Sequence, residues 1–180
     1  MDLYVAFLRG MNLGGRRIKN DELRRPFEEW GFEGVSTFRA SGNVIFESDE
    51  EDEEALAARI ESGLGEALGY EVPVFLRSAA EVLAIAAHEP FDLRLVSAST
   101  GKLQVSLLKE APEASVRSRV LALSTDEDRL AVHGRELYWL PSGGISDSTL
   151  DLKAIDAALG LATMRTIGTI EQIAAKHCAG

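Results

Sequence analysis

Glycine and basic residues are concentrated between positions 9 and 19, where they could bind an anion. Gly10 and Gly15 have the spacing of a P-loop, the glycine-rich turn whose backbone N–H groups surround the phosphates of a nucleotide. The rest of that motif differs, because Arg16 occupies the lysine position and Arg17 has no hydroxyl for magnesium. We therefore expect anion binding here rather than hydrolysis of a nucleoside triphosphate, with Lys19 adding positive charge where a helix begins.

A second polar segment, residues 41–43, is expected to lie beside the first. It forms the turn between two predicted strands, residues 35–40 and 44–47. In a β-α-β-β arrangement the third strand commonly pairs with the first, which would bring this turn next to Arg9. The candidate ligand-binding residues are Arg9, Gly10, Asn12, Gly14, Gly15, Lys19, Arg39, Ser41 and Asn43. The sequence leaves open the alternative that the glycines only form a turn and the arginines are solvated.

Other groups that could carry chemistry are few. The three histidines, His88, His133 and His177, are far apart in the sequence, and none can be paired with a nucleophile. Cys178 is the single cysteine, so neither an internal disulfide nor a structural zinc site is expected. Trp139 on a predicted hairpin could flank a ligand, although such a residue is more often part of the core. The sequence therefore identifies no catalytic residue, no cofactor and no metal site.

The charge and hydropathy of the chain exclude several classes of protein. Its net charge of -10 argues against general binding to nucleic acid, which requires a basic face. No apolar run approaches the roughly 20 residues that span a bilayer, and the first residues lack the features of a signal peptide. An apolar content of 46% is sufficient for a real core. We expect a globular cytoplasmic protein with no membrane interaction.

The elements that would position the candidate site form one recognisable unit. Residues 3–8 are a continuous apolar run, as in a central strand covered on both faces. The helices and strands expected after it are residues 20–30, 35–40, 44–47, 51–68 and 72–76. Residues 1–77 thus have the β-α-β-β-α-β order of a ferredoxin-like subdomain, one antiparallel sheet with two helices on one face. Tyr4, Phe7 and Phe46 invite comparison with RNA-recognition modules, but their alternation favours core aromatics.

The remaining sequence repeats much of this order. Residues 78–101 are expected to form a connecting helix and loop, and residues 102–180 a C-terminal α+β subdomain. Its predicted elements are a strand at 102–108, a helix from 112, strands at 130–132 and 137–140, and helices at 150–159 and 169–177. The predicted fold class is α+β, a ferredoxin-like βαββαβ unit followed by a second, similar βαββα half. This duplication requires residues 102–140 to form one sheet.

Three segments resemble the bacterial family catalogued as domain of unknown function 1697: YVAFLRGMNLGG at residues 4–15, SGNVIF at 41–46 and VPV at 72–74. The resemblance continues through residues 89–91 and 137–146 and so covers nearly the whole chain. The resemblance implies two ferredoxin-like parts, and no established catalytic residues can be carried over from the family. One position departs from the family pattern, because Arg165 is followed by Thr166 and Ile167 rather than by asparagine and an aromatic residue. Either a polar contact has changed there or a helix start has been repacked.

Three functions remain open on this basis. The first is binding of a small anionic or polar ligand, in the nucleotide or phosphate-metabolite class, at residues 10–19. The second is an enzyme with a cleft between the two halves, which would contain a group with a disturbed pKa. The third is a structural module that forms homo-oligomers through sheet edges or its last helix. The sequence does not decide among them.

Overall fold

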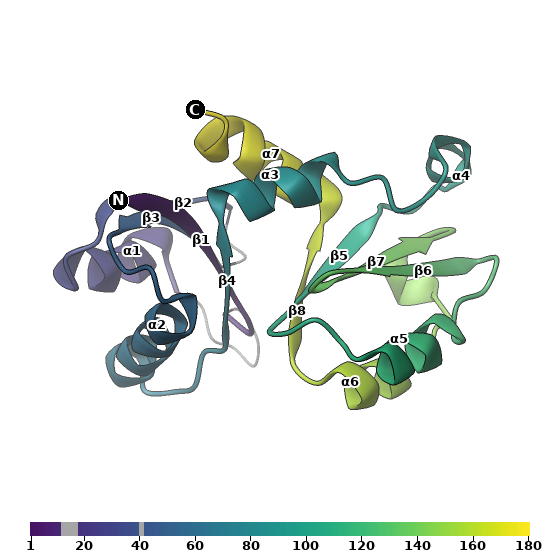
Figure 1. Ribbon diagram of the computed structural model, residues 1–180, viewed down its shortest axis with the longest axis horizontal. Helices are drawn as coiled ribbons and strands as arrows, with labels where there is room; N and C mark the ends of the chain where they lie inside the picture. Colours follow the sequence, from purple (N-terminus) through teal and green to yellow (C-terminus); the bar gives the residue numbers. More distant parts are fainter. Residues whose placement is uncertain (12–17, 40–41) are drawn as a thin grey trace. The chain divides into compact units, whose positions relative to one another are not determined.

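The computed structural model describes residues 1–11, 18–39 and 42–180. The chain forms two compact units, one made of residues 1–85 and 172–180 and the other of residues 86–171 (Figure 1). Among the described residues, no helix combines the length and the apolar character needed to cross a membrane. Four of the residues proposed for the site, Asn12, Gly14, Gly15 and Ser41, lie outside the described part of the chain.

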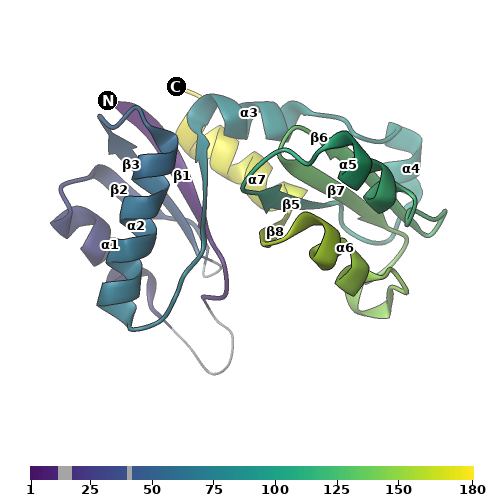
Figure 2. The same cartoon turned by 60° about the horizontal axis from the view of Figure 1, so that its bottom comes forward.

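Unit 1 has the β-α-β-β-α-β order expected from the sequence. Its elements are β1 (Asp2–Leu8), α1 (Asn20–Glu29), β2 (Glu33–Thr37), β3 (Asn43–Ser48), α2 (Glu53–Leu68), β4 (Val74–Ser78) and a following helix, α3 (Ala79–Ala87). The strands form one antiparallel sheet in the order β2-β3-β1-β4. Helices α1 and α2 cover the same face of that sheet (Figures 1 and 2). This is the ferredoxin-like arrangement.

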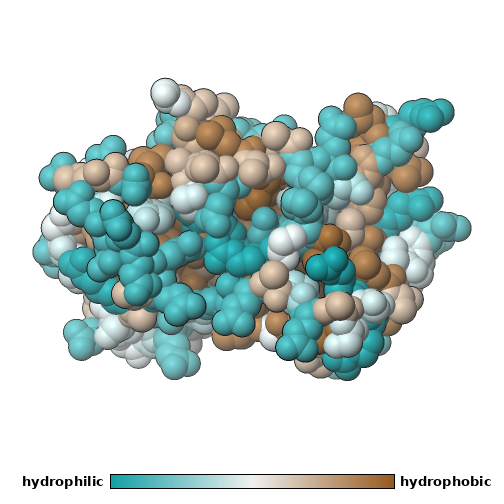
Figure 3. Space-filling model, in the orientation of Figure 1, coloured by the Kyte–Doolittle hydropathy of each residue, from teal (hydrophilic) through white to brown (hydrophobic). Residues whose placement is uncertain are grey.

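Strand β1 is buried on both faces, which explains its continuous apolar sequence. Tyr4, Ala6 and Leu8 point into the core beneath α1 and α2. Val5 and Phe7 on the opposite face are fully buried as well. Tyr4 stacks on Phe46 with 6.0 Å between ring centroids, so both rings belong to the core, as predicted. The outer sides of α1 and α2 carry hydrophilic residues (Figure 3).

Helix ends in unit 1 follow local sequence signals. Asp52 caps α2 by accepting a hydrogen bond from Ala55 N at 3.1 Å, so the helix begins after it. Helix α3 begins with a capping box: Ser78 N donates to Glu81 Oε2 at 2.8 Å, and Glu81 N donates to Ser78 Oγ at 3.2 Å. Helix α1 contains Pro26, which has no N–H to donate to the carbonyl of Glu22, and the helix ends at Glu29.

Unit 2 contains a second sheet with the same strand arrangement. Its elements are α4 (Leu93–Ala98), β5 (Gln104–Leu108), α5 (Ala114–Leu121), β6 (Asp128–His133), β7 (Glu136–Pro141), a 3-10 turn (Ile145–Asp147), α6 (Leu152–Leu159), β8 (Ala162–Thr166) and α7 (Ile167–Ile173). The end of α7 from Gln172 onward and the π-helical turn that follows it, Ala174–Cys178, belong to unit 1. The sheet order is β6-β7-β5-β8, so residues 102–140 contribute to one sheet as the duplication required. One face packs against Val120 of α5 and Ile155 of α6.

Strand β8 is an addition to the predicted second half, which was expected to stop at βαββα. In this strand the polar side chains of Thr163 and Arg165 are buried, whereas the apolar side chain of Met164 is exposed. Arg165 satisfies part of its guanidinium locally, donating from Nη1 to Thr163 Oγ1 and to Met164 O, both at 2.8 Å. Periodicity could not identify a strand whose buried positions are polar.

The two units share more than strand order. Arg77 of β4 pairs with Val5 of β1, and Arg165 of β8 pairs with Val105 of β5, so both fourth strands carry a buried arginine at the same place. Each arginine donates to the carbonyl of the preceding residue. The second helix of each unit is capped by an aspartate, Asp52 in α2 and Asp151 in α6. These matches support a duplicated architecture in the absence of visible sequence repetition.

The turn before β3 is a sensitive point of unit 1. Gly42 has φ +79°, and a Cβ added to it would lie 2.7 Å from Met11 Cγ and 3.1 Å from Leu8 O. We predict that Gly42→Ala lowers the free energy of unfolding by the left-handed strain of about 1–2 kcal/mol plus an overpacking cost of about 1–3 kcal/mol.

Gly134 in the β6–β7 turn is the matched control. Its φ is +57°, but an added Cβ would have its nearest neighbour at 4.0 Å. Gly134→Ala should therefore lose only the strain contribution. Urea unfolding of both variants measures the difference, and equal losses would show that the close packing around Gly42 contributes nothing.

Candidate functional site

The end of β1 and the start of β3 lie side by side, as the sequence analysis expected. Phe7 is paired with Asn43, and Leu8 N donates to Gly42 O at 2.8 Å. On the other side, Arg9 N donates to Pro73 O at 3.1 Å. We call this region, residues 9–11, 18–19, 38–39 and 42–43, the β1–β3 end. It collects residues from two connections, β1–α1 and β2–β3, at one end of the strands of the unit 1 sheet.

Asn43 shapes this region from the inside. Its side chain is fully buried and donates from Nδ2 to Phe38 O at 2.8 Å. Phe38 N donates to Asn43 O at 3.0 Å, so side chain and backbone together close the loop between β2 and β3. Asn43 therefore holds the loop and does not face solvent.

Three basic residues of the predicted site are described. Arg9 follows β1 and is half-buried, and Lys19 is exposed at the start of α1. Arg39 is exposed in the β2–β3 loop. Gly10 has φ +75°, a left-handed conformation that suits glycine. The β1–β3 end thus has basic side chains on or near its surface and a buried amide beneath them.

Arg39 has the most unusual backbone of this group. Its φ is +57°, and among the described residues it is the only non-glycine with a positive φ. Its Nη2 donates to Gln172 Oε1 at 2.7 Å, and its guanidinium lies 5.4 Å from the centroid of the Phe38 ring. Sequence reasoning missed Gln172, because nothing local links residues that are 133 positions apart.

Two histidines that are distant in the sequence meet in unit 2. His88 stacks on His133 with 4.2 Å between ring centroids and an interplanar angle of 17°, and it also contacts Tyr138 at 5.2 Å. Burial lowers the pKa of His88, and the charge of His133 lowers it further. The surroundings of His88 therefore favour its neutral imidazole. Sequence reasoning could not pair them, because His88 follows α3 whereas His133 ends β6.

The other candidates from the sequence have structural surroundings. Trp139 is buried and donates from Nε1 to Asp128 Oδ1 at 2.9 Å, and Ser148 Oγ donates to the same oxygen at 2.8 Å. Burial raises the pKa of the Cys178 thiol, which keeps it protonated and weakly nucleophilic. Burial lowers the pKa of Arg165 to about 10, so it remains charged at neutral pH. Within the described residues, no group of three or more acidic, histidine or cysteine side chains could hold a metal ion.

Comparison with known proteins agrees with the architecture. The family described as "Protein of unknown function (DUF1697)" matches residues 1–138, which confirms the resemblance seen in the sequence. A solved structure, that of the conserved bacterial protein SP0830 from Streptococcus pneumoniae, is similar to this chain with a TM-score of 0.75 and 21% sequence identity, and the alignment covers 97% of each chain. At that identity the likeness concerns the fold. No curated protein matches the chain.

The histidine pair predicts a loss of stability in acid. An unfolded histidine has a pKa of about 6.5, so lowering the pKa of His88 on folding means that the unfolded chain binds more protons. The stabilisation is present above that value and is lost as the pH falls through the lower pKa of the folded state. We expect the free energy of unfolding to decrease between pH 7.5 and 5.5, and to decrease less in His88→Gln.

His177 provides the comparison, because burial and Lys176 lower its pKa independently of the pair. In urea unfolding, His88→Gln and His177→Gln should reduce the pH dependence additively. His88→Gln and His133→Gln should not be additive, since each removes the same repulsion. An unchanged pH dependence in His88→Gln would rule out the pair as its source.

Proposed function

The chain belongs to the family of proteins of unknown function DUF1697, and we propose that its β1–β3 end binds a small anionic ligand of the nucleotide or phosphate-metabolite class. Basic residues from two connections support this assignment: Arg9 and Lys19 between β1 and α1, and Arg39 between β2 and β3. The whole chain has a net charge of -10, so a local group of basic residues is a departure from its general character. Arginine and lysine are the side chains that proteins use to hold phosphate groups.

The backbone of Arg39 is the observation that carries the proposal. A non-glycine residue in a sparsely populated conformation costs about 1–3 kcal/mol and is typical of functional loops. Glycine or asparagine would occupy the same φ of +57° at lower cost. An arginine at this position places a long cationic side chain on an exposed loop at the expense of stability. That trade is expected where the charge has a role in binding.

The contacts of Arg39 leave it suited to receive an anion. Its bond to Gln172 and its position over Phe38 orient the guanidinium without neutralising it, because both partners are uncharged. A guanidinium has five N–H donors, and the bond to Gln172 employs one nitrogen. Since the residue is exposed, an incoming phosphate can reach the others. Gln172 is thus proposed as a positioning residue for Arg39.

Replacing Arg39 tests the site and its strain together. Arg39→Gly removes the cation and relieves the left-handed strain, so binding should weaken at least about tenfold, as expected for a lost charge-assisted hydrogen bond of about 1.5–3 kcal/mol. Relief of the strain raises the free energy of unfolding, whereas the greater entropy of glycine in the unfolded chain lowers it. The net change should therefore lie between zero and an increase of about 1 kcal/mol. Calorimetry against inorganic phosphate, pyrophosphate and AMP measures binding, and urea unfolding measures stability.

Two further variants keep the result interpretable. Arg39→Asn retains a residue that tolerates positive φ and lacks the charge, so it should bind as weakly as Arg39→Gly. Arg117→Gln removes an exposed arginine from α5 in unit 2 and should bind like the unmodified protein. Failure of the unmodified protein to bind any of the three anions at 1 mM, or full binding by Arg39→Asn, would overturn the proposal.

A further inference from the structure

The loop after β5 in unit 2 stands at the topological position that residues 9–19 have in unit 1. In both units this loop joins the central strand to the helix that follows it, β1 to α1 and β5 to α5. The central strand also ends with an equivalent hydrogen bond in each unit, Leu8 N to Gly42 O at 2.8 Å and Leu108 N to Arg135 O at 2.9 Å. A second connection, from the second helix to the fourth strand, begins with Gly69 in unit 1 and Gly160 in unit 2. The two positions can therefore be compared directly.

Both connections are shorter in unit 2, and this leaves part of its core uncovered. In unit 1, residues 9–19 and 69–73 place Met11, Ile18, Tyr70 and Val72 against the core. In unit 2 the corresponding segments are only residues 109–113 and 160–161. Their one large apolar residue, Leu161, is 53% exposed. The core edge that unit 1 closes with its own side chains is thus open in unit 2.

A pocket of about 280 Å³ occupies this place. Its apolar lining consists of Leu108, Ala111, Pro112, Val116, Ala158, Leu159 and Leu161. The volume is close to the lower limit of about 300 Å³ for small-molecule sites, so only a small ligand would fit. The matching connections of unit 1 place Met11, Ile18, Tyr70 and Val72 against the core, so the pocket is suited to an apolar group. Its own apolar lining consists of leucine, valine, alanine and proline, which favours an aliphatic group.

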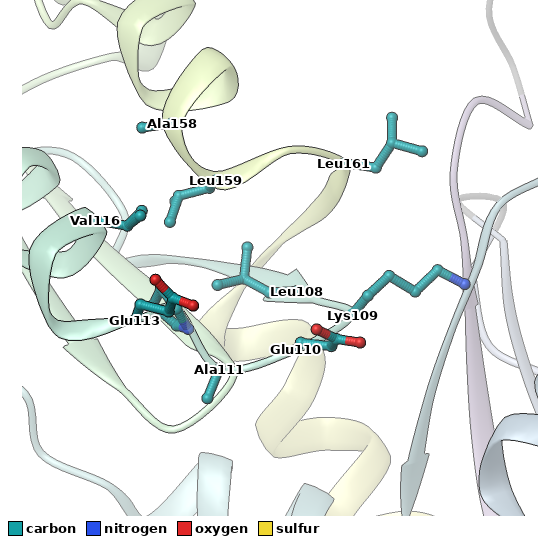
Figure 4. Close-up of a pocket in the computed structure, with 10 residues that line it drawn as sticks. Leu108, Lys109, Glu110, Ala111, Glu113, Val116, Ala158, Leu159 and Leu161 are labelled. Atoms are coloured by element: carbon teal, nitrogen blue, oxygen red, sulfur yellow. The ribbon is translucent and has the colours of Figure 1, made fainter.

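The charged residues of the pocket indicate the head group of that ligand. Glu110, Glu113 and Lys109 also line the pocket. Figure 4 shows the Lys109 ammonium extending away from Leu108, Val116 and Leu159, whereas the Glu113 carboxylate remains on their side of the pocket. The charge left beside the apolar surface is therefore negative. It would repel a carboxylate and attract an ammonium group.

We propose that this pocket of unit 2 binds a small aliphatic primary amine. The hydrocarbon part lies against Leu108, Val116 and Leu159, and the ammonium donates to the Glu113 carboxylate. This site is separate from the β1–β3 end and selects the opposite charge. Its occupancy does not depend on the anion site, so either site can fail its test without affecting the other.

A titration with three ligands that differ in the head group tests which charge the pocket prefers. Isoamylamine, isoamyl alcohol and 4-methylpentanoate share a branched aliphatic part and differ in charge. Amide chemical shifts of ¹⁵N-labelled full-length protein should change saturably at residues 108–116 and 158–161. The amine should bind at least about tenfold more tightly than the alcohol, as a charge-assisted hydrogen bond implies, and the acid more weakly than both. Equal or tighter binding of the acid, or no saturable change with the amine up to 20 mM, would overturn the proposal.

Paired variants separate the pocket from general attraction of cations to an acidic protein. Ala158→Leu fills the pocket without changing any charge and should abolish saturable binding of the amine. Ala157→Leu, at an exposed position of the same helix, should leave it unchanged. Amine binding that survives Ala158→Leu would show that the cation is held elsewhere and would refute the assignment.

A charge variant covers the case in which Ala158→Leu fails to fold. Glu113→Gln alters an exposed side chain and should weaken the amine about tenfold while leaving the alcohol unchanged. Glu71→Gln, an exposed carboxylate of unit 1, is its control and should change neither ligand. Equal effects of Glu113→Gln and Glu71→Gln on the amine would reject a role for Glu113.

Discussion

The structure of each unit depends on a central strand that must be covered on both faces. In unit 1, Val5, Ala6 and Phe7 are fully buried, and in unit 2 every residue of β5 is buried. Neighbouring strands satisfy the backbone of such a strand, and helices must cover its side chains. This requirement places β3 and β4 beside β1, and β7 and β8 beside β5. The loops that follow β1 and β5 therefore lie at the ends of these central strands, next to the turn that precedes β3 or β7.

The two units apply this arrangement with different loops. Met11 and Ile18 close the core of unit 1, and Lys19 in the same connection is exposed. Residues 109–113 are too few to close the equivalent edge of unit 2, and a pocket results. The two similar scaffolds therefore differ in the two connections that border this part of the core. Conserved packing and variable loops are the usual means by which one fold acquires different sites.

Two kinds of polar residue can be distinguished in this protein: buried residues that hold the fold, and exposed residues that a ligand can reach. Asn43 and Asp128 are buried and hydrogen-bonded to nearby groups, which makes them structural anchors of their hairpins. Arg39 differs, because it is exposed and its backbone is strained. Burial and hydrogen bonding thus distinguish Asn43 from Arg39, although the sequence placed both residues in one candidate site. Of the polar candidates described, Arg39 has the strongest physical reason to serve a ligand.

Local pattern was sufficient to predict most elements of this protein. The apolar run of β1 and the turn-forming residues before β3 depend on neighbouring residues, so the ferredoxin-like order and the proximity of residues 42–43 to the end of β1 followed from them. Strand β8 was missed because its buried positions are Thr163 and Arg165, whose burial depends on partners elsewhere in the sheet.

Contacts between distant segments were decided by folding. The bond of Arg39 to Gln172, the stack of His88 on His133 and the open core edge beside Leu108 each join residues that no local pattern connects. The physical reason is that periodicity and capping act over a few residues, whereas these features depend on sheet order and loop length. Residues 9–19 could therefore be recognised from composition as a polar, glycine-rich segment, but the surroundings of its basic residues follow from the strands that bring the β2–β3 loop to the end of β1.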